Sequence, residues 1–569
     1  MKKFDLTRTK QGDKLRVLTH GSSLLRFPLF NKGSGFTPEE RQRFELEGLL
    51  PSHHNDIETQ AERTYKTIMF NKDPVGRHIG LAALQDRNEH LYYKVLSLHL
   101  EELMPIVYTP TVGLASQHFS RTFRRGRGIW ITPAHRGRIE EILRKAAPYS
   151  GVQLMVVTDN ESILGIGDQG AGGMAISVGK LALYCAGAGI HPARTLPISL
   201  DVGTDNQTLL DDPLYLGWRE ERLRGIQYDE LVEEFVEAAK AVFPDVLIQW
   251  EDFRKDNALG ILDRYRDRIP SFNDDIQGTG AVAAACIVAA CKISNTPLKD
   301  SRVLIYGAGA AGLGITRQIK ALLRSHGVEG EALQTSVLTM DSRGVLSDGR
   351  PMLDEYKKEL SWPEALADQL SLSASDRRDL VSVINAYRPT TLIGASGHAG
   401  AFNRAVVTAM TSVTDEPTIL PMSNPTSISE GTPAKIMEWS NGSALVATGS
   451  PFDDLVVNGK KRRIGQANNV FIFPGLGLGA IVTGARQVSD GMISAASYAL
   501  AESLTERDLA NRCLMPEVSC LWDVSGRVGL AVARQAIADG VATIKNDENL
   551  EELIDQYRWR PAYPEFVDK

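Results

Sequence analysis

Residues 302–315, RVLIYGAGAAGLGI, predict a strand that runs into a glycine-rich turn and then a helix. Gly307, Gly309 and Gly312 have G-x-G-x-x-G spacing, which permits a tight turn and the close approach of a pyrophosphate. At the start of the helix, free N–H groups and the helix dipole favour anions. We therefore expect this turn to bind a dinucleotide.

The next expected strand, SVLTMD, ends at Asp341, whose carboxylate can accept hydrogen bonds from a ribose diol. Asp341 lies later than the usual distance of about 20 residues from the glycines, and a longer helix accounts for the delay. A carboxylate here repels a 2′-phosphate and so favours NAD over NADP. Arg343 and Lys357 lie nearby in the sequence and leave NADP open.

A second stretch, ILGIGDQGAGG, repeats the same spacing at Gly165, Gly167 and Gly170, and Asp201 ends a following strand. Both stretches cannot be the main cofactor turn. Polar and acidic residues interrupt the approach to the second stretch, whereas the strand before Gly307 is continuous and apolar. The sequence therefore favours residues 302–315.

Short apolar runs alternate with longer helix-like segments from about residue 150 onward. The runs are QLMVVT, TLPISLD, DVLIQW, RVLIY, SVLTMD, TTLIGAS and ALVATG. This alternation is typical of βα units on a largely parallel sheet. Residues 38–105 instead have helical spacing, and the sequence beyond about 485 is again helical. We expect a multidomain α/β protein with a Rossmann-type domain and helical N- and C-terminal regions.

The composition fits a soluble protein of several domains, with 569 residues, 43% hydrophobic residues and a net charge of -7. The longest apolar run, residues 281–291, is shorter than the about 20 residues that cross a bilayer. The N-terminus lacks the apolar core of a secretion signal. A pI near 6.0 disfavours nucleic-acid binding. We expect a cytoplasmic protein without membrane or nucleic-acid partners.

The cysteines and the basic clusters indicate no chemistry by themselves. The five cysteines are odd in number and lack C-x-x-C spacing, so we expect core thiols and neither a disulfide framework nor a zinc site. They are Cys185, Cys286, Cys291, Cys513 and Cys520. Two basic clusters, Arg121 to Arg127 and residues 460–463, are typical of solvated faces or subunit contacts.

Two acidic pairs follow expected strands. Glu251 and Asp252 come directly after DVLIQW, and Asp274 and Asp275 lie in SFNDDIQGTG. Ligands of open α/β sheets gather at the carboxyl ends of the strands. Carboxylate oxygens without histidine or cysteine suit Mg²⁺ or Mn²⁺. Adjacent acids are also common on surfaces, but their apolar neighbours favour a metal site.

Lys180 and Tyr108 are candidates for acid–base chemistry. Lys180 lies in the apolar stretch AISVGKLALY, where desolvation lowers the pKa of a lysine and can make it a general base. Tyr108, in MPIVYTPTVG, is typical of a packing residue and less often an acid. By themselves both side chains also fit purely structural roles.

Eight segments together resemble the malic enzyme family, from about residue 25 to near residue 560. They are IVYTPTVGLA, VGKLALY, LDVGTDN, WEDF, FNDDIQGT, the GAGAAGLG turn, SNPT and IFPGLGLG. The resemblance implies oxidative decarboxylation of L-malate to pyruvate and CO₂, with reduction of NAD and a divalent metal, Mg²⁺ or Mn²⁺. It also implies a homo-oligomer, a dimer or a tetramer.

The resemblance also implies roles for single residues and for domains. Lys180 corresponds to the general base and Tyr108 to the general acid. Glu251, Asp252 and Asp275 correspond to metal ligands, Asp274 to a charge partner of the lysine, Asp275 and Asn424 to cofactor contacts, and Asn424 and Asn469 to malate contacts. The expected divisions are a helical N-terminal region (1–105), a substrate and metal domain (106–293), an NAD-binding Rossmann-type domain (294–450), and a return segment with C-terminal helices (451–569).

The segment TDNESILG departs from the family, whose members typically carry arginine at the position of Ser162. A hydroxyl cannot supply the charged, bidentate clamp that arginine makes with a carboxylate. Related malolactic enzymes, which convert malate to lactate with tightly held NAD, also have a small residue there. They remain an alternative, whereas retained Lys180 and acidic residues disfavour an inactive, nucleotide-sensing regulator. Arg63 and Arg87 resemble two arginines that bind a dicarboxylate activator in some members.

Overall fold

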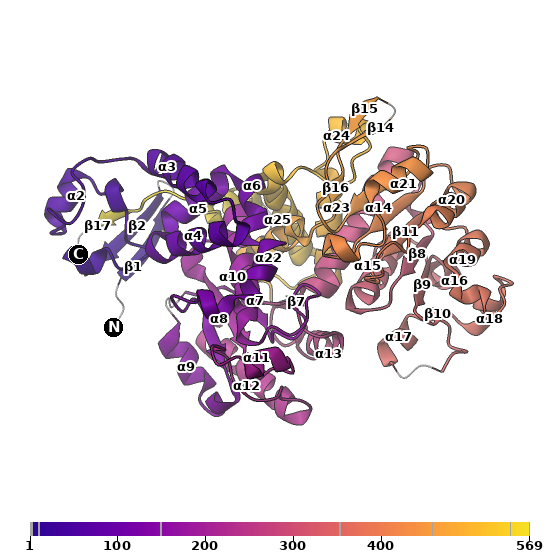
Figure 1. The fold of residues 1–569 in the computed structure, drawn as a ribbon, viewed down its shortest axis with the longest axis horizontal. Helices are drawn as coiled ribbons and strands as arrows, with labels where there is room; N and C mark the ends of the chain where they lie inside the picture. The colour runs from indigo at the N-terminus through magenta and orange to yellow at the C-terminus, as the bar shows by residue number, and fades with distance from the viewer. Residues whose placement is uncertain are drawn as a thin grey trace. The chain divides into compact units, whose positions relative to one another are not determined.

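The structure is a computed structural model that describes residues 4–9, 12–147, 151–351, 354–457, 459–546 and 548–567. The chain divides into two units, which are described separately (Figure 1). Unit 1 consists of residues 1–244 and 552–569, and unit 2 of residues 245–551.

Unit 1 contains a parallel sheet whose strands are buried on both faces. β5 (Thr195–Leu200) pairs with β3 (Ile129–Ile131) on one side and with β4 (Leu154–Thr158) on the other. Every residue of β4 and β5 is buried, which explains their continuous apolar sequences. The helices α9 (Ile139–Ala146), α10 (Met174–Leu183) and α12 (Ile226–Val242) belong to the same unit.

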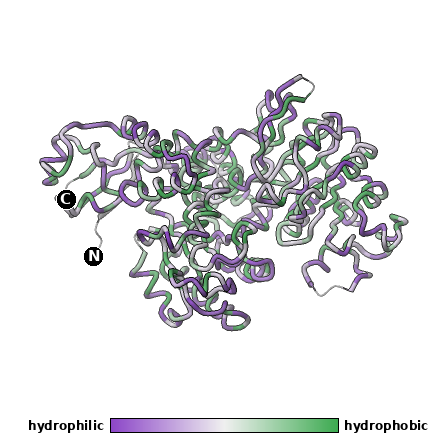
Figure 2. The backbone as a smooth tube through the Cα atoms, viewed as in Figure 1, coloured by the Kyte–Doolittle hydropathy of each residue, from purple (hydrophilic) through white to green (hydrophobic). Residues whose placement is uncertain are grey.

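The helical prediction for residues 38–105 is confirmed except at residues 44–56, which form turns and loop. These residues form α2 (Pro38–Arg43), α3 (Ile57–Phe70), α4 (Pro74–Arg87), α5 (Glu89–Leu98) and α6 (Leu100–Val107). Asp56, Asp73 and Asn88 cap the starts of three of them by accepting hydrogen bonds from backbone N–H groups. Many residues of α2 and α3 are hydrophilic, in agreement with their Glu-, Gln- and Arg-rich sequences (Figure 2).

The terminal regions also contain strands that the sequence analysis did not predict. β1 (Phe4–Thr9) and β2 (Gly12–Val17) form an antiparallel hairpin, and β17 (Glu565–Val567) adds to β2 in parallel. The Phe566 ring packs against Phe44 and Phe36, at centroid distances of 5.3 and 6.0 Å. Pairing between opposite ends of a chain leaves no local sequence signal.

The larger sheet, in unit 2, has the order β10-β9-β8-β11-β12-β13-β16. Its strands are β8 (Val303–Tyr306), β9 (Val337–Asp341), β10 (Gly344–Val345), β11 (Thr391–Gly394), β12 (Thr418–Pro421), β13 (Leu445–Thr448) and β16 (Gly465–Gln466). All pairs are parallel except β9 with β10. After β8, the next strands β9 and β10 lie on one side of it, and β11, β12 and β13 lie on the other. This strand order confirms the Rossmann-type prediction.

Helices cover this sheet and continue beyond it. The main ones are α14 (Thr279–Ser294), α15 (Ala310–Ser325), α19 (Leu380–Tyr387), α20 (Arg404–Val413), α21 (Pro433–Trp439), α22 (Phe473–Thr483), α23 (Asp490–Glu502) and α25 (Leu521–Ala538). α19, α20 and α21 share one hydrophobic core with the sheet. Unit 2 also contains the parallel pair β6 (Leu247–Trp250) and β7 (Ser271–Asn273).

Two helical stretches, Gly170–Ala188 and Asp274–Ser294, are long and apolar enough to cross a membrane by length and composition alone. Most of their residues are buried inside the protein, so we interpret both as core helices.

All five cysteines are free thiols. The expectation of core thiols is confirmed for Cys185, Cys286 and Cys513, whereas Cys291 is partly exposed. It is wrong for Cys520, which is exposed.

Candidate active site

In unit 1, the structure brings Lys180 and Tyr108 together. Lys180 lies on α10 with 1% of its surface exposed, and Tyr108 ends α6 with 6% exposed. The Lys180 Nζ atom lies 5.1 Å from the centroid of the Tyr108 ring. Burial of this kind removes the amine from bulk water, where an ammonium group is costly unless a partner compensates it.

A glycine beside Lys180 makes this approach possible. A Cβ atom added at Gly179 would lie 2.7 Å from the carbonyl oxygen of Val107 and 3.6 Å from Cδ2 of Tyr108. Any other residue would therefore separate α10 from the end of α6. The glycine before Lys180 allows the two backbones to approach, and the approach places the lysine against the tyrosine.

In unit 2, three of the predicted acidic residues form a cluster. Glu251 and Asp252 directly follow β6, and Asp275 lies in a π-helical turn, η6 (Asp274–Gly278), that follows β7. One carboxylate oxygen from each lies within 4.8 Å of the others. Gln249 Nε2 donates to Glu251 Oε2 at 2.7 Å, and the Asp252 N–H donates to Asp275 Oδ2 at 2.8 Å. The three carboxylates fit a hard divalent cation.

The fourth acidic residue, Asp274, contacts a different partner. Its side chain is buried, and Asn469 Nδ2 donates to its Oδ2 at 3.0 Å and to its backbone oxygen at 3.1 Å. The same amide donates to Thr279 Oγ1 at 3.1 Å. Asn469 begins a short 3₁₀ helix, η10 (Asn469–Phe471), so this contact joins η10 to the start of α14. Two predicted site residues, Asp274 and Asn469, are therefore neighbours.

The glycine fingerprint forms the predicted strand–turn–helix. Gly307 follows β8 with φ +125°, and a Cβ there would lie 2.3 Å from the oxygen of Ala395, which follows the neighbouring β11. A Cβ at Gly312 would lie 1.9 Å from the oxygen of Gly307, whereas Gly309 faces open space. Two glycines are therefore required by the turn itself, and the third leaves room where a ligand can approach the start of α15.

Asp341 ends β9 beside this turn, because the Gly307 N–H donates to the oxygen of Met340. Its carboxylate accepts from Arg350 NH2 at 3.0 and 3.1 Å and from Lys357 Nζ at 3.0 Å. Partial burial favours a higher pKa, but the Arg343 N–H and the two cationic side chains outweigh it and lower the pKa of Asp341. Asp341 is therefore an anion that already holds two cations.

One further predicted position, Asn424, lies in a loop. It follows β12, and its Oδ1 accepts from Ser450 Oγ at 2.6 Å.

The second glycine stretch lacks a strand that runs directly into it. Gly165 lies seven residues after the end of β4, whereas Gly307 directly follows β8. This difference supports the choice of residues 302–315 as the dinucleotide turn.

Ser162 follows Glu161, whose carboxylate is held by Arg224 at 2.6 Å. Arg224 NH2 also lies 2.5 Å from Asp205 Oδ2. Nearby in the same loop region, the buried Arg222 forms an ion pair with Asp168 at 2.8 Å. Both arginines are thus engaged by carboxylates of unit 1.

Arg63 and Arg87 line one pocket of about 530 Å³ between α3 and α4. Asn31, Gln60 and Asn88 contribute polar groups to the same wall. Two guanidinium groups with neutral amides form a setting that suits an anion. The activator role that the resemblance implies for these arginines stays a prediction.

Sequence reasoning missed Arg350 as a partner of Asp341. It lies nine residues after Asp341, in a loop without a recognisable motif. The only sequence sign that the Asp341 carboxylate has cationic partners is the presence of two arginines and two lysines in residues 343–358.

Comparison with known proteins places both halves of the chain in one family. Residues 85–266 match the family model described as malic enzyme, N-terminal domain, and residues 276–537 match malic enzyme, NAD binding domain. The chain is 46% identical over 543 residues to the NAD-dependent malic enzyme of Shewanella putrefaciens, covering 95% of this chain and 96% of the relative. It is 45% identical to that of Photorhabdus laumondii over the same shares.

Solved structures agree at the level of the fold. The malic enzyme of Entamoeba histolytica superposes with a TM-score of 0.54 at 22% identity, over 90% of this chain and 92% of that chain. The Pyrococcus horikoshii malic enzyme gives 0.53 at 22% identity, over 80% and 88%. The two family matches, together with an identity of nearly half over almost the whole length, establish that the chain belongs to the malic enzyme family.

Proposed function

We propose that this protein catalyses the oxidative decarboxylation of L-malate to pyruvate and CO₂ with reduction of NAD. The observation that carries the proposal is the buried Lys180 amine against the Tyr108 ring. An acid–base pair of this kind is what the reaction requires, and the relatives over 95% of the chain are named NAD-dependent malic enzymes. The alternative of a malolactic enzyme has no support among these relatives.

Lys180 and Tyr108 perform the two proton transfers. The neutral amine of Lys180 takes the proton from the C2 hydroxyl of malate while C2 is oxidised. After CO₂ leaves C4, the hydroxyl of Tyr108 donates a proton to C3 and completes pyruvate. Burial of both side chains excludes water that would otherwise compete as proton donor and acceptor.

Glu251, Asp252 and Asp275 are proposed to hold Mg²⁺ or Mn²⁺. Their close oxygens, without histidine or cysteine, are the donor set that such ions prefer. When bound, such a metal would act as a Lewis acid and stabilise the negative charge that develops on the C2 oxygen as CO₂ departs. Asp274 and Asn469 are proposed to orient groups at this site, because a hydrogen bond joins their side chains. Asn469 is also proposed as a malate contact.

The dinucleotide is proposed to lie on the turn of Gly307, Gly309 and Gly312. The start of α15 offers N–H groups to the pyrophosphate, and Asp341 accepts from the ribose hydroxyls. Asn424 and Asp275 are proposed as further cofactor contacts, and Asn424 also as a malate contact. When bound, NAD supplies the acceptor for the hydride from C2.

The test follows the absorbance of NADH when purified protein receives L-malate, NAD and Mn²⁺. We expect NADH to accumulate with L-malate. It should not accumulate with D-malate, or after a chelator has removed the metal. Absence of NADH formation under all conditions in which the protein is folded and binds NAD would contradict the proposal.

Three expectations for the whole chain stay predictions. They are a substrate and metal domain at 106–293 with an NAD-binding domain at 294–450, a homo-oligomer, and a cytoplasmic location. The larger sheet, with six of its seven strands between Val303 and Thr448, supports the second domain. Light scattering of the purified protein decides between monomer, dimer and tetramer.

Asp341→Ser is expected to shift the cofactor preference toward NADP. The substitution removes the anion that repels a 2′-phosphate and releases Arg350 and Lys357, which now hold it. One or two new charge-assisted hydrogen bonds are worth about 1.5–3 kcal/mol each, so kcat/KM for NADP relative to NAD should rise at least about 10-fold. Steady-state kinetics with both cofactors measure this ratio. An unchanged ratio would show that Asp341 does not face the 2′ position.

Ser162→Arg is expected to lower the Michaelis constant for malate. A guanidinium at this position adds a charged clamp for a carboxylate, and a single charge-assisted hydrogen bond corresponds to about 10-fold or more. Ser162→Gln, of similar length but without charge, is the matched control. A constant that is unchanged or higher in the arginine variant would show that another group of the protein already fills the role.

A further inference from the structure

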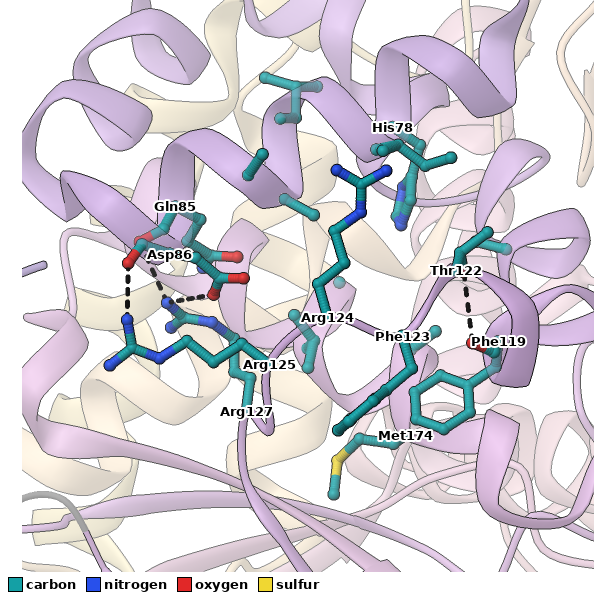
Figure 3. A pocket seen from close by; sticks show the side chains of 18 of the residues that line it. His78, Gln85, Asp86, Phe119, Thr122, Phe123, Arg124, Arg125, Arg127 and Met174 are labelled. Carbon is teal, nitrogen blue, oxygen red and sulfur yellow. Dashed lines mark hydrogen bonds and ion pairs between the residues drawn. The ribbon is translucent and has the colours of Figure 1, made fainter. Parts of the chain in front are cut away.

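A second cavity in unit 1, of about 140 Å³, lies between α4, the segment 115–130 and α10 (Figure 3). One wall consists of the rings of Phe119, Phe123 and Trp130, whose centroids lie 5.6 to 6.3 Å from one another. Met174 adds a thioether, and Ala82 and Ala175 leave the centre open. Apolar cavities of about 150 Å³ bind benzene, so this one has room for a single ring or a short chain.

The mouth of the cavity carries three arginines, of which two are engaged. Arg127 pairs with Glu89 at 2.7 Å and with Asp86 at 3.6 Å. Arg125 NH1 donates to the backbone oxygen of Asp86 at 2.9 Å. For Arg124, no carboxylate lies within ion-pair distance among the residues that the structure describes. Figure 3 shows its guanidinium extending toward His78 instead.

His78 adds a neutral polar group to the same wall. Its Nδ1 atom lies 2.9 Å from the carbonyl oxygen of Ile106, which can only accept, so Nδ1 carries the hydrogen. Burial lowers the pKa of His78, and the ring is therefore neutral at physiological pH. Arg127 is paired with two carboxylates, whereas Arg125 keeps its charge because its partner is a backbone oxygen. A ligand entering the cavity therefore meets the positive charges of Arg124 and Arg125 beside a neutral His78.

We propose that this cavity binds a small amphipathic carboxylate, with its ring or short chain against Phe119 and Trp130 and its carboxylate at Arg124. The apolar walls supply affinity for the ring, and the guanidinium selects for a negative charge. Malate itself has no apolar part, so the ligand class differs from the proposed substrate.

The lining also includes Val107 and Gly179, the residues before Tyr108 and Lys180. A bound ligand therefore contacts the backbone that carries the proposed acid and base. This coupling rests on the proposed function, whereas ligand binding does not.

The test uses full-length protein and 4-fluorophenylacetate as probe, followed by ¹⁹F NMR. We expect saturable binding, and at least about 5-fold weaker binding of the neutral 4-fluorophenylacetamide, the factor that corresponds to about 1 kcal/mol. Arg124→Gln should weaken binding of the acid by a similar factor. Arg121→Gln is the matched control, because Arg121 belongs to the same exposed segment but does not line the cavity.

Ala82→Leu fills the cavity and should remove probe binding, while thermal unfolding verifies that the variant is folded. Absence of saturable binding to the wild type would overturn the proposal. This holds also if binding fails because a second copy of the chain covers the mouth of the cavity. Equal affinity for acid and amide, or for wild type and Arg124→Gln, would overturn the role of the charge. For the coupling, saturating probe should change kcat in the wild type but not in Ala82→Leu. A probe that binds without changing kcat would overturn the coupling alone.

Discussion

Replacing Lys180 with alanine should lower kcat for malate oxidation by about 1000-fold, within the about 10²- to 10⁴-fold that a general base contributes. Water that fills the space left by this buried side chain is a much weaker base than an amine, so it cannot take its place as proton acceptor. The affinity for NADH, measured by its fluorescence, should stay within about 2-fold because the predicted dinucleotide turn uses other residues.

Added methylamine should restore part of the activity of Lys180→Ala, because a small amine can enter the space left by the side chain. A purely structural lysine would show no such rescue. Lys240→Ala is the control, since Lys240 is a partly exposed lysine of the same unit that pairs with Glu237. Full malate turnover in a folded Lys180→Ala variant would contradict the assignment of the base.

Asp275→Asn should weaken Mn²⁺ binding by at least about 100-fold, because loss of a direct ligand exceeds the about 10- to 100-fold cost of losing a ligand's supporting contact. The amide keeps the size of the side chain, and its oxygen can still accept the Asp252 N–H, which now bonds Asp275 Oδ2 at 2.8 Å. The charge of the cluster falls while its shape is retained.

Electron paramagnetic resonance of Mn²⁺ measures this affinity without substrate or turnover. Asp267→Asn, which neutralises an exposed acid of the same unit, should bind Mn²⁺ as the wild type does. If Asp275→Asn retained wild-type affinity, Asp275 would not be a metal ligand and Mn²⁺ would have to bind elsewhere.

The strands and the dinucleotide turn could be predicted from the sequence because their requirements are local. Strands buried on both faces, such as β4 and β8, need apolar residues at nearly every position. Gly307 and Gly312 are the residues whose Cβ atoms the turn cannot accommodate. Pairing of β17 with β2 could not be predicted, because it depends on contacts between opposite ends of the chain.

The candidate site was predictable as a set of residues but not as an arrangement. The sequence placed Glu251 and Asp275 at strand ends, but not the turn that directs the adjacent Asp274 toward Asn469. The approach of Lys180 to Tyr108 depends on packing between two helices, for which Gly179 was the only local sign. Of the two side-chain cations that hold Asp341, Lys357 was noted in the sequence, whereas Arg350 comes from a loop and only the structure shows its contact.

Oxidative decarboxylation of malate is tested directly by identifying the product formed from uniformly ¹³C-labelled L-malate. Purified protein with NAD and Mn²⁺ is followed by ¹³C NMR, and NADH is measured in the same sample. We expect pyruvate, CO₂ and NADH in equal amounts. Lactate formed without accumulation of NADH would contradict this expectation and identify a malolactic reaction on the same fold.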